Sequence, residues 1–269
     1  LISGYVRNDE AHEALDCFGQ MQRKGFLPDG ITFASVLGAC GHIGATGKGQ
    51  QIHNEIINRS LLEKNVVLGN ALIDMYAKCG ALTRARQVLD ELRVRDIVSW
   101  STLIAGHAKG GNCDEALNCF HQMQREGLCP NEVTFLSVLN ACSHSGKFNE
   151  AEEYYENMQR NFDFTPKLEH DTCMVVVFGS IGRFDKAMAV IESMPFSDDP
   201  SVWIALLGAC KKWGNVRLGR LIFDNMVQRG ANLSGAYALM SNIYASAGFQ
   251  EDVKKIEEAI RVDDTIALN

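Results

Sequence analysis

Apolar residues recur along this chain with the spacing of amphipathic helices. In the segment CDEALNCFHQMQREG, residues 113–127, they occupy positions i, i+3, i+4 and i+7: Ala116, Cys119, Phe120 and Met123. This spacing places the apolar side chains on one face of a helix and leaves polar residues on the opposite face. Gly127 follows the last apolar position, where a glycine commonly ends a helix.

A shorter and more apolar segment precedes each amphipathic one, for example LIDMYAKCG or LIAGHAKGG. Neither a run of alternating apolar and polar residues nor a hairpin-turn sequence separates the two kinds of segment. We therefore predict an all-α protein made of antiparallel helix-turn-helix pairs.

The helix pairs repeat along the whole chain. Residues 14–40 and 116–142 are identical at 17 of 27 positions and lie 102 residues apart. Equivalent residues of successive pairs are separated by 35, 36, 31, 35, 36, 32 and 33 positions; they are Leu1, Val36, Leu72, Leu103, Val138, Met174, Leu206 and Leu239. Repeats of this length stack on their neighbours rather than around one closed core, which predicts a solenoid.

Composition narrows the class of protein. The chain is 46% hydrophobic and 22% charged, as in ordinary globular proteins. No segment approaches the ~18 uncharged apolar residues of a membrane span, so we expect no membrane association. The nine cysteines include no C-x-x-C pair, which favours reduced thiols that pack in the interior. Because the chain begins at Leu1, inside a repeat, we expect it to be part of a longer protein with any targeting sequence outside it.

The charge is acidic and uneven. Residues 1–131 carry 13 basic and 14 acidic side chains, a net charge of −1, whereas residues 132–269 carry 13 and 19, a net charge of −6. A nucleic-acid binder that depends on phosphate neutralisation is basic. This chain is not basic, which counts against nucleic-acid binding and limits how tightly the chain is expected to bind it.

The repeats resemble the plant pentatricopeptide repeat (PPR) family, specifically its PLS class. LISGY followed by EALDCFGQMQRKGFLPD resembles a P motif, GITFASVLGACGHIGATGKGQQIH an L motif, and VVLGNALIDMYAKCGALTRARQVLDEL an S motif. A second P, L and S set follows. The motifs span residues 1–29 (P, truncated), 30–65 (L), 66–96 (S), 97–131 (P), 132–167 (L) and 168–199 (S), so that the PLS array covers 1–199.

The last segments, PSVWIALLGACKKWGNVRLG and GAYALMSNIYASAGFQEDV, resemble the two E motifs that close such proteins. They define a second region, 200–269, with motifs at 200–233 and 234–269. The resemblance fades after about Ile260. It implies a right-handed superhelical solenoid of antiparallel helix-turn-helix repeats.

The family reads RNA with the fifth and last residues of each motif, which face the concave groove and contact one base. The resemblance thus implies three complete base-reading pairs and one half pair; they are Asn70 with Asp96, Ser101 with Asn131, Thr172 with Asp199, and Asp29 from the truncated motif. Second-position residues would flank the bases; these are Val67 and Val98. The L motifs carry weaker RNA candidates, which do not match the usual pairs; they are Ala34 with Asn65 and Leu136 with Lys167.

The hydrogen-bonding capacity of these side chains agrees with base reading. An ionised Asp only accepts hydrogen bonds, which suits the ring N–H of guanine or uracil, whereas Asn can donate to the bare ring nitrogens of adenine or cytosine. A short hydroxyl residue at the fifth position leaves room for a purine, and a longer Asn suits a pyrimidine. Hence we predict U for Asn70/Asp96, A for Ser101/Asn131 and G for Thr172/Asp199. The target would be single-stranded RNA, in which these base edges are exposed.

A purely structural interpretation of the same residues is also open. Asp29 and Asn131 each follow a proline. Asp and Asn are common at such turns and at helix N-caps, where the side chain accepts a hydrogen bond from the backbone. From the sequence alone, both interpretations stand.

No catalytic, metal or cofactor site is predicted. His53, Asn54 and Glu55 fit H-x-E, half of the zinc-deaminase signature, but no P-C-x-x-C accompanies them. We therefore expect a protein that is not itself an enzyme and that needs no cofactor.

The resemblance implies a site-recognition factor for C-to-U RNA editing in a mitochondrion or chloroplast. The partial target is 5′-(G/U)-n-U-A-n-G-n-n-n-C, in which the last C is edited. The E motifs would recruit or position a deaminase, in cis or in trans, and proteins of the editing complex would bind the L motifs. One alternative is a helical-repeat scaffold that binds a peptide in its groove, which the acidic second half favours. Another is a factor for RNA stability or splicing, against which the E motifs argue.

Overall fold

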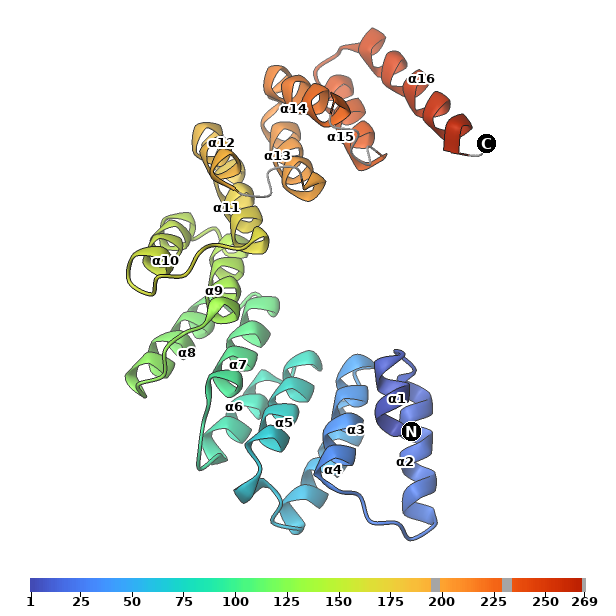
Figure 1. The fold of residues 1–269 in the computed structure, drawn as a ribbon, viewed down its shortest axis with the longest axis vertical. Coiled ribbons are helices and arrows are strands. Elements are labelled where there is room, and N and C mark those ends of the chain that lie inside the picture. The colour runs from blue at the N-terminus through green and yellow to red at the C-terminus, as the bar shows by residue number, and fades with distance from the viewer. Residues whose placement is uncertain (195–198, 229–233, 268–269) are drawn as a thin grey trace. The chain divides into compact units, whose positions relative to one another are not determined.

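The computed structural model describes residues 1–194, 199–228 and 234–267 (Figure 1). Within these ranges the regular structure consists of helices without a strand, which confirms the predicted all-α fold. None of the described helices is both long and apolar enough to cross a membrane. The helices are α1 (Ile2–Arg7), α2 (Ala11–Arg23), α3 (Gly30–His42), α4 (Thr46–Asn58), the 3₁₀ helix η1 (Leu62–Lys64), α5 (Val66–Lys78), α6 (Leu82–Glu91), α7 (Ile97–Lys109), α8 (Cys113–Arg125), α9 (Glu132–His144), α10 (Phe148–Arg160), α11 (Leu168–Ser180), α12 (Phe184–Ser193), α13 (Pro200–Trp213), α14 (Val216–Gln228), α15 (Ser234–Ser246) and α16 (Gln250–Ala267).

Short turns join the helices into consecutive pairs. Gly111, between α7 and α8, has φ 72°, and Gly127, just after α8, has φ 78°. Both values lie in the left-handed region, which glycine adopts without the steric cost that a Cβ atom brings. The odd-numbered helices from α3 to α15 begin at residues 30, 66, 97, 132, 168, 200 and 234, where the predicted motifs begin. Each motif thus starts with a helix, and the residue that ends the preceding motif lies directly before it.

The helices form two compact units, Leu1–Ser145 and Gly146–Asn269. In the first unit, the leading helices of successive pairs pack side by side in the order α1, α3, α5, α7 and α9 (Figure 1). In the second unit, α11 packs on α13 and α13 on α15. Within each unit, the second helix of a pair packs against its own leading helix, as α8 does on α7. Contacts between neighbouring repeats are the organisation that a solenoid requires.

Small residues at equivalent positions fill the interior between helices. Cys40 and Cys142 on the leading helices α3 and α9, and Cys210 on α13, are fully buried, and no disulfide joins the described cysteines. Burial raises the pKa of the Cys40 and Cys210 thiols to about 11, so both are protonated at neutral pH. Because the thiolate is the reactive form, these cysteines pack as small apolar residues, as predicted.

Two glycines allow leading helices to approach closely. A Cβ atom on Gly106 of α7 would lie 2.8 Å from the Cβ atom of Ala77 on α5. In the second unit, a Cβ atom on Gly179 of α11 would lie 2.6 Å from that of Ala209 on α13. Neither distance is compatible with an undistorted side-chain contact, so a hydrogen atom at these positions is what permits the observed spacing.

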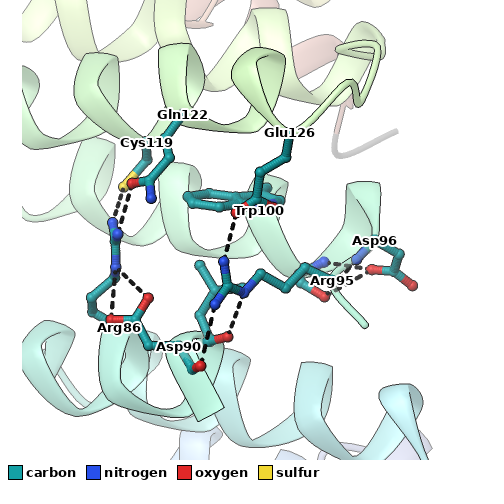
Figure 2. A network of polar contacts seen from close by, with 10 residues as sticks. Arg86, Asp90, Arg95, Asp96, Trp100, Cys119, Gln122 and Glu126 are labelled. Atoms are coloured by element: carbon teal, nitrogen blue, oxygen red, sulfur yellow. Dashed lines mark hydrogen bonds and ion pairs between the residues drawn. The ribbon is translucent and has the colours of Figure 1, made fainter. Parts of the chain in front are cut away.

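A polar network joins α6, α7 and α8 (Figure 2). The Glu126 carboxylate accepts hydrogen bonds from Arg95 Nη1 at 2.6 Å and from Trp100 Nε1 at 3.0 Å. The Arg86 guanidinium lies 5.5 Å from the centroid of the Trp100 ring and donates to Gln122 Oε1 at 2.7 Å. Trp100 itself is fully buried. The carboxylate of Glu126 therefore satisfies the only polar atom of a large core side chain, and holds the segment before α7 at the end of α8.

We expect Gly106→Ala to lower the free energy of unfolding by about 1–2 kcal/mol, since overpacking outweighs the gain in helix propensity. The matched control is Gly38→Ala in α3, where an added Cβ atom would meet Val6 Cγ1 at an ordinary 3.8 Å. That change is expected to stabilise the chain by about 1 kcal/mol. Urea unfolding followed by circular dichroism measures both. A Gly106→Ala variant as stable as the control would contradict the close approach of α5 and α7.

We expect Glu126→Ala to destabilise the chain by about 1–3 kcal/mol, because it leaves the buried indole N–H of Trp100 without an acceptor. Glu126→Gln keeps an acceptor oxygen, so its loss of stability should be less than half of that in Glu126→Ala. Thermal unfolding of the two variants beside wild type measures the difference. Equal losses in both variants would mean that the ion pair with Arg95, rather than the indole hydrogen bond, stabilises the contact between the end of α8 and the start of α7.

Candidate nucleic-acid interface

Among the described residues, the residue that ends each predicted motif from 29 to 199 is the N-cap of the next leading helix. The side chains of Asp29, Asn65, Asp96, Asn131 and Asp199 accept a hydrogen bond from a backbone N–H of the first helical turn. Those N–H groups have no partner within the helix, so an acidic or amide side chain at this place stabilises the helix start. The capping interpretation of these residues is therefore correct. It leaves base reading possible, because capping uses one of the two terminal atoms of each side chain.

The first predicted pair, Asn70 and Asp96, is brought together by the fold. Asn70 Nδ2 donates to Asp96 Oδ1 at 3.2 Å and lies 3.4 Å from Oδ2. The hydroxyl of Ser99 lies 2.6 Å from Asn70 Oδ1 and 2.9 Å from Asp96 Oδ1. Both members of the pair are half-buried, whereas Ser99 is fully buried beneath them.

The second predicted pair, Ser101 and Asn131, is joined through a third residue. The Ser101 hydroxyl lies 2.7 Å from Thr134 Oγ1, and Thr134 Oγ1 donates to Asn131 Oδ1 at 2.8 Å. The backbone N–H of Thr134 also donates to Asn131 Oδ1, at 2.9 Å. Because Oδ1 faces two donors, the amide Nδ2 of Asn131 points away from the cap and can donate to another group.

Hydrogen bonding keeps the Asp carboxylates ionised. Burial acts to raise the pKa of Asp96, but hydrogen bonds from Ser99 and Asn70 outweigh it, and the net pKa is lowered. Hydrogen bonds from Thr32 lower the pKa of Asp29, and those from Ser201 lower the pKa of Asp199. At neutral pH these three side chains are therefore pure acceptors, as the predicted base preferences require.

A cavity of about 340 Å³ opens beside the second pair. Ser101 and Asn131 line it, together with Val98 and Val133, the second-position residues of two successive motifs. The wall also contains lysines from the ends of α5 and α7; these are Lys78 and Lys109. Lys78 pairs with Asp74 at 2.7 Å, while Lys109 has no ion-pair partner among the described residues. Polar groups, branched aliphatic side chains and a cation thus converge on one site within the first unit.

Second-position residues are exposed throughout the first unit. Their exposed fractions are 73% for Ile31, 65% for Val67, 54% for Val98 and 59% for Val133. The predicted flanking residues Val67 and Val98 therefore belong to a larger set, and Ile31 and Val133 were missed. The repeat register already contained the signal, since all four occupy the second position of a motif. Exposed β-branched residues at a fixed repeat position can cover the faces of a ligand's flat rings.

The third predicted pair is not joined by a hydrogen bond. Thr172 Oγ1 donates to the backbone oxygen of Leu168 at 2.7 Å. Asp199 Oδ1 accepts from the backbone N–H of Ser201 at 2.8 Å and from its hydroxyl at 2.5 Å. Asp29, from the truncated motif, is exposed, and its Oδ1 accepts from Thr32 Oγ1 at 2.7 Å. The cap is present at both Asp residues, but no hydrogen bond joins Asp199 to its fifth-position partner Thr172.

The L-motif candidates have less polar surroundings. Ala34 and Leu136 are half-buried and have no polar side-chain atom to offer a base. Asn65 caps α5 by accepting from the Leu68 N–H at 3.1 Å. Lys167 is exposed, and its backbone N–H donates to His170 Nδ1 at 3.2 Å. These residues therefore form no cluster of the kind found at Asn70 or Ser101.

Sequence comparison identifies the repeats. A model of the PPR repeat family matches residues 1–42 and 95–144, and a model of the PPR repeat matches 70–97, 133–161 and 201–230. Together these matches cover more than half of the chain. Their spacing agrees with the helix pairs described above.

Curated relatives and solved structures agree with this match. A mitochondrial pentatricopeptide repeat-containing protein of Arabidopsis thaliana is 36% identical over 262 residues, which are 97% of this chain and 56% of the relative. A chloroplastic one from the same plant is 39% identical over 256 residues, 95% of this chain and 34% of the relative. The chain thus spans about half or less of the length of these relatives.

The fold resembles that of PPR10 from maize, with a TM-score of 0.59, 21% identity, and coverage of 97% of this chain and 43% of PPR10. PPR10 in complex with an 18-nucleotide psaJ RNA element gives a TM-score of 0.61 at 18% identity, covering 97% and 44%. At these identities the likeness concerns the fold, which is that of a helical-repeat solenoid. From the matched repeats, the plant relatives and the stacked helix pairs, we conclude that this chain belongs to the pentatricopeptide repeat family.

Proposed function

We propose that this chain binds single-stranded RNA and reads one base with each complete pair of fifth and last residues. The observation that carries the proposal is the cavity beside Ser101 and Asn131, flanked by Val98 and Val133. The polar pair offers hydrogen bonds to a base edge, and the two valines offer apolar contact to its faces. Family membership supports the same function, and PPR10 is a relative in fold whose solved complex contains RNA.

The atoms left over from capping account for the proposed base preferences. Asp96 Oδ2 remains as an acceptor beside the Asn70 amide, which suits the ring N–H and a carbonyl oxygen of uracil. Asn131 Nδ2 remains as a donor beside the Ser101 hydroxyl, which suits the ring nitrogen of adenine in a pocket with room for a purine. Thr172 with Asp199 is proposed to prefer G, and Asp29 to accept from G or U.

Base contacts rather than phosphate contacts are proposed to supply most of the affinity. The chain has a net charge of −7, so its general electrostatic attraction for RNA is weak. Lys109 in the wall of the cavity is one cation positioned to neutralise a phosphate of a bound strand. Base contacts distinguish one RNA sequence from another, which is what a factor that binds one site among many requires.

The biological role that fits these features is site recognition for C-to-U editing in a mitochondrion or chloroplast. The PLS-type spacing, the two E-like motifs at 200–233 and 234–269, and relatives named mitochondrial and chloroplastic support it. The proposed target is 5′-(G/U)-n-U-A-n-G-n-n-n-C, with the last C edited. The E-like region would position a deaminase, in cis or in trans, and editing-complex proteins would bind the L motifs.

We expect Asn131→Asp to change the preferred base at the fourth nucleotide of this ten-nucleotide target from A to G. Asp replaces the donor Nδ2 with an acceptor and caps helices as well as Asn does, so the fold should persist. The A-to-G ratio of dissociation constants should change by about tenfold or more. Fluorescence anisotropy with four RNAs that differ only at this nucleotide measures it.

Asn65→Asp is the matched control for that experiment. It makes the same change of charge at another helix N-cap, but Ala34, its fifth-position partner, has no polar group. It should weaken binding of all four RNAs equally and leave the wild-type base order intact. If wild type itself binds the four RNAs equally, direct base reading is wrong for this chain, and a peptide-binding scaffold becomes the better interpretation.

Loss of the protein in the plant separates editing from the other RNA roles. We expect one or a few cytidines in matching sequences to remain unedited while the abundance and splicing of their transcripts stay unchanged. Sequencing of organellar complementary DNA measures all three. Normal editing with reduced or unspliced transcript would instead assign the RNA-binding function to stability or splicing.

A further inference from the structure

The cap and the fifth-position residue share a buried hydroxyl in two of the motif junctions, and sequence reasoning did not single it out. The hydroxyl belongs to the third residue of the following motif, Ser99 after the first S motif and Thr134 after the second P motif. We infer that Ser99 and Thr134 are positioning residues that determine how strictly their pairs discriminate between bases. This inference rests on the proposed function, because it concerns the same base-reading pairs.

Neither hydroxyl can act by touching RNA. Ser99 and Thr134 are both 0% exposed, whereas Asn70, Asp96 and Asn131 are half-buried and Ser101 is 6% exposed. Ser99 and Thr134 lie at N3 of α7 and α9, and each forms a reciprocal capping box with the N-cap residue. Their influence on a base must therefore pass through the side chains that they hold.

At the first junction the hydroxyl sits between both members of the pair. Ser99 Oγ is 2.6 Å from Asn70 Oδ1 and 2.9 Å from Asp96 Oδ1, and it has one proton to donate to either. It also accepts from the Asp96 backbone N–H at 3.2 Å. Asn70 Nδ2 completes the cluster by donating to Asp96. The orientation of the Asn70 amide and that of the Asp96 carboxylate are thus fixed by the same atom.

At the second junction Thr134 Oγ1 links the pair in a chain. It contacts Ser101 Oγ at 2.7 Å, donates to Asn131 Oδ1 at 2.8 Å and accepts from the Asn131 backbone N–H at 3.3 Å. Ser101 and Asn131 have no direct hydrogen bond to each other among the described contacts. Their relative placement therefore depends on Thr134.

A helix cap alone does not fix the plane of an Asp or Asn side chain. The χ2 torsion of these residues is broad, so one hydrogen bond to Oδ1 still permits rotation of the other terminal atom. A second donor on Oδ1, itself held by the fifth-position residue, restricts that rotation. The restricted atom is Oδ2 of Asp96 or Nδ2 of Asn131, the atom proposed to meet the base edge. Preorganisation of this kind increases the penalty for a base whose edge does not match.

The other junctions provide a natural comparison. At two of them, the third residue of the following motif is Leu68 after Asn65 and Val202 after Asp199, and neither has a polar side-chain atom. At the junction after Asp29, the third residue is Thr32, which has the same hydrogen bond to the cap. Asp199 Oδ1 accepts instead from the backbone N–H and the hydroxyl of Ser201, and no hydrogen bond ties either residue to Thr172. We therefore expect discrimination at U and A, the nucleotides of the first S and second P motifs, to be sharper than at the G proposed for Thr172/Asp199.

The test replaces the hydroxyl and keeps the shape. Thr134→Val removes the hydroxyl while leaving the backbone cap to Asn131 and the side-chain volume in place. Thr134→Ser restores the hydroxyl. The matched control is Ser137→Ala on the same helix, since Ser137 is also buried but donates only to the backbone oxygen of Val133 at 2.8 Å. Binding of four RNAs that differ at the fourth nucleotide and four that differ at the third, and the unfolding temperature, are measured for each protein.

We expect Thr134→Val to reduce the preference for A by about fivefold, the value of one net hydrogen bond. The preference for U at the third nucleotide should be unchanged. Thr134→Ser and Ser137→Ala should keep the wild-type preference for A. Ser99→Ala should show the converse pattern, with loss at U and none at A.

Two results would overturn the inference while leaving the proposed function intact. One is a Thr134→Val protein that keeps the full wild-type preference for A, whether or not its unfolding temperature falls. The other is an equal loss of preference in Ser137→Ala, which would assign the effect to helix stability rather than to the hydroxyl. Absence of any base preference in wild type would contradict the proposed function, and the inference with it.

Discussion

The hydrogen bond from a helix N-terminus to the last side chain of the preceding motif constrains this structure at five of the described motif junctions, those that end in Asp or Asn. The first backbone N–H groups of a helix have no partner within it, and Asp or Asn supplies one. In Asp96 and Asn131 the bond uses Oδ1 and leaves the second terminal atom directed elsewhere. At these junctions the residue before the helix is consequently also the residue that presents a polar atom at a fixed place in the repeat.

Helix packing sets the spacing between successive caps. Because leading helices stack on one another, the spacing of successive caps follows from how closely the helices approach. Gly106 against Ala77 sets that approach between α5 and α7, and Glu126 ties the start of α7 to the end of α8 (Figure 2). A displaced helix would move its cap, its second-position residue and its fifth-position residue together. Stability and recognition are therefore linked in this fold through rigid helices rather than through a separate site.

The acidic balance of the chain limits how the proposed RNA recognition can work. A protein with a net charge of −7 gains little from general attraction to a polyanion. Aliphatic side chains exposed at the second position, together with Asp and Asn held by capping, offer apolar and directional contacts instead. Directional contacts distinguish bases, whereas phosphate contacts do not. For the proposed RNA binding, weak electrostatics thus favour selectivity over tight binding.

The sequence by itself determined the helices, the start of each repeat and the residues at equivalent positions. These features depend on local patterns, namely apolar spacing, glycines at helix ends and Asp or Asn before a helix, which each segment carries independently of its neighbours. The repeat register also places Ile31 and Val133 at the second position of their motifs, the position that Val67 and Val98 occupy. A comparison of all second positions therefore predicts that these two side chains are exposed as well.

Only the tertiary structure decided which of the predicted pairs are joined. Asn70 and Asp96 are 26 residues apart, and Ser101 and Thr134 are 33 apart, so their hydrogen bonds exist because one helix packs on the next. The same packing buries Ser99 and Thr134 beneath the pairs and leaves Thr172 and Asp199 without a hydrogen bond between them. A local sequence pattern does not predict these hydrogen bonds or this burial. The distance between two side chains on different helices depends on the volume of all the side chains packed between them.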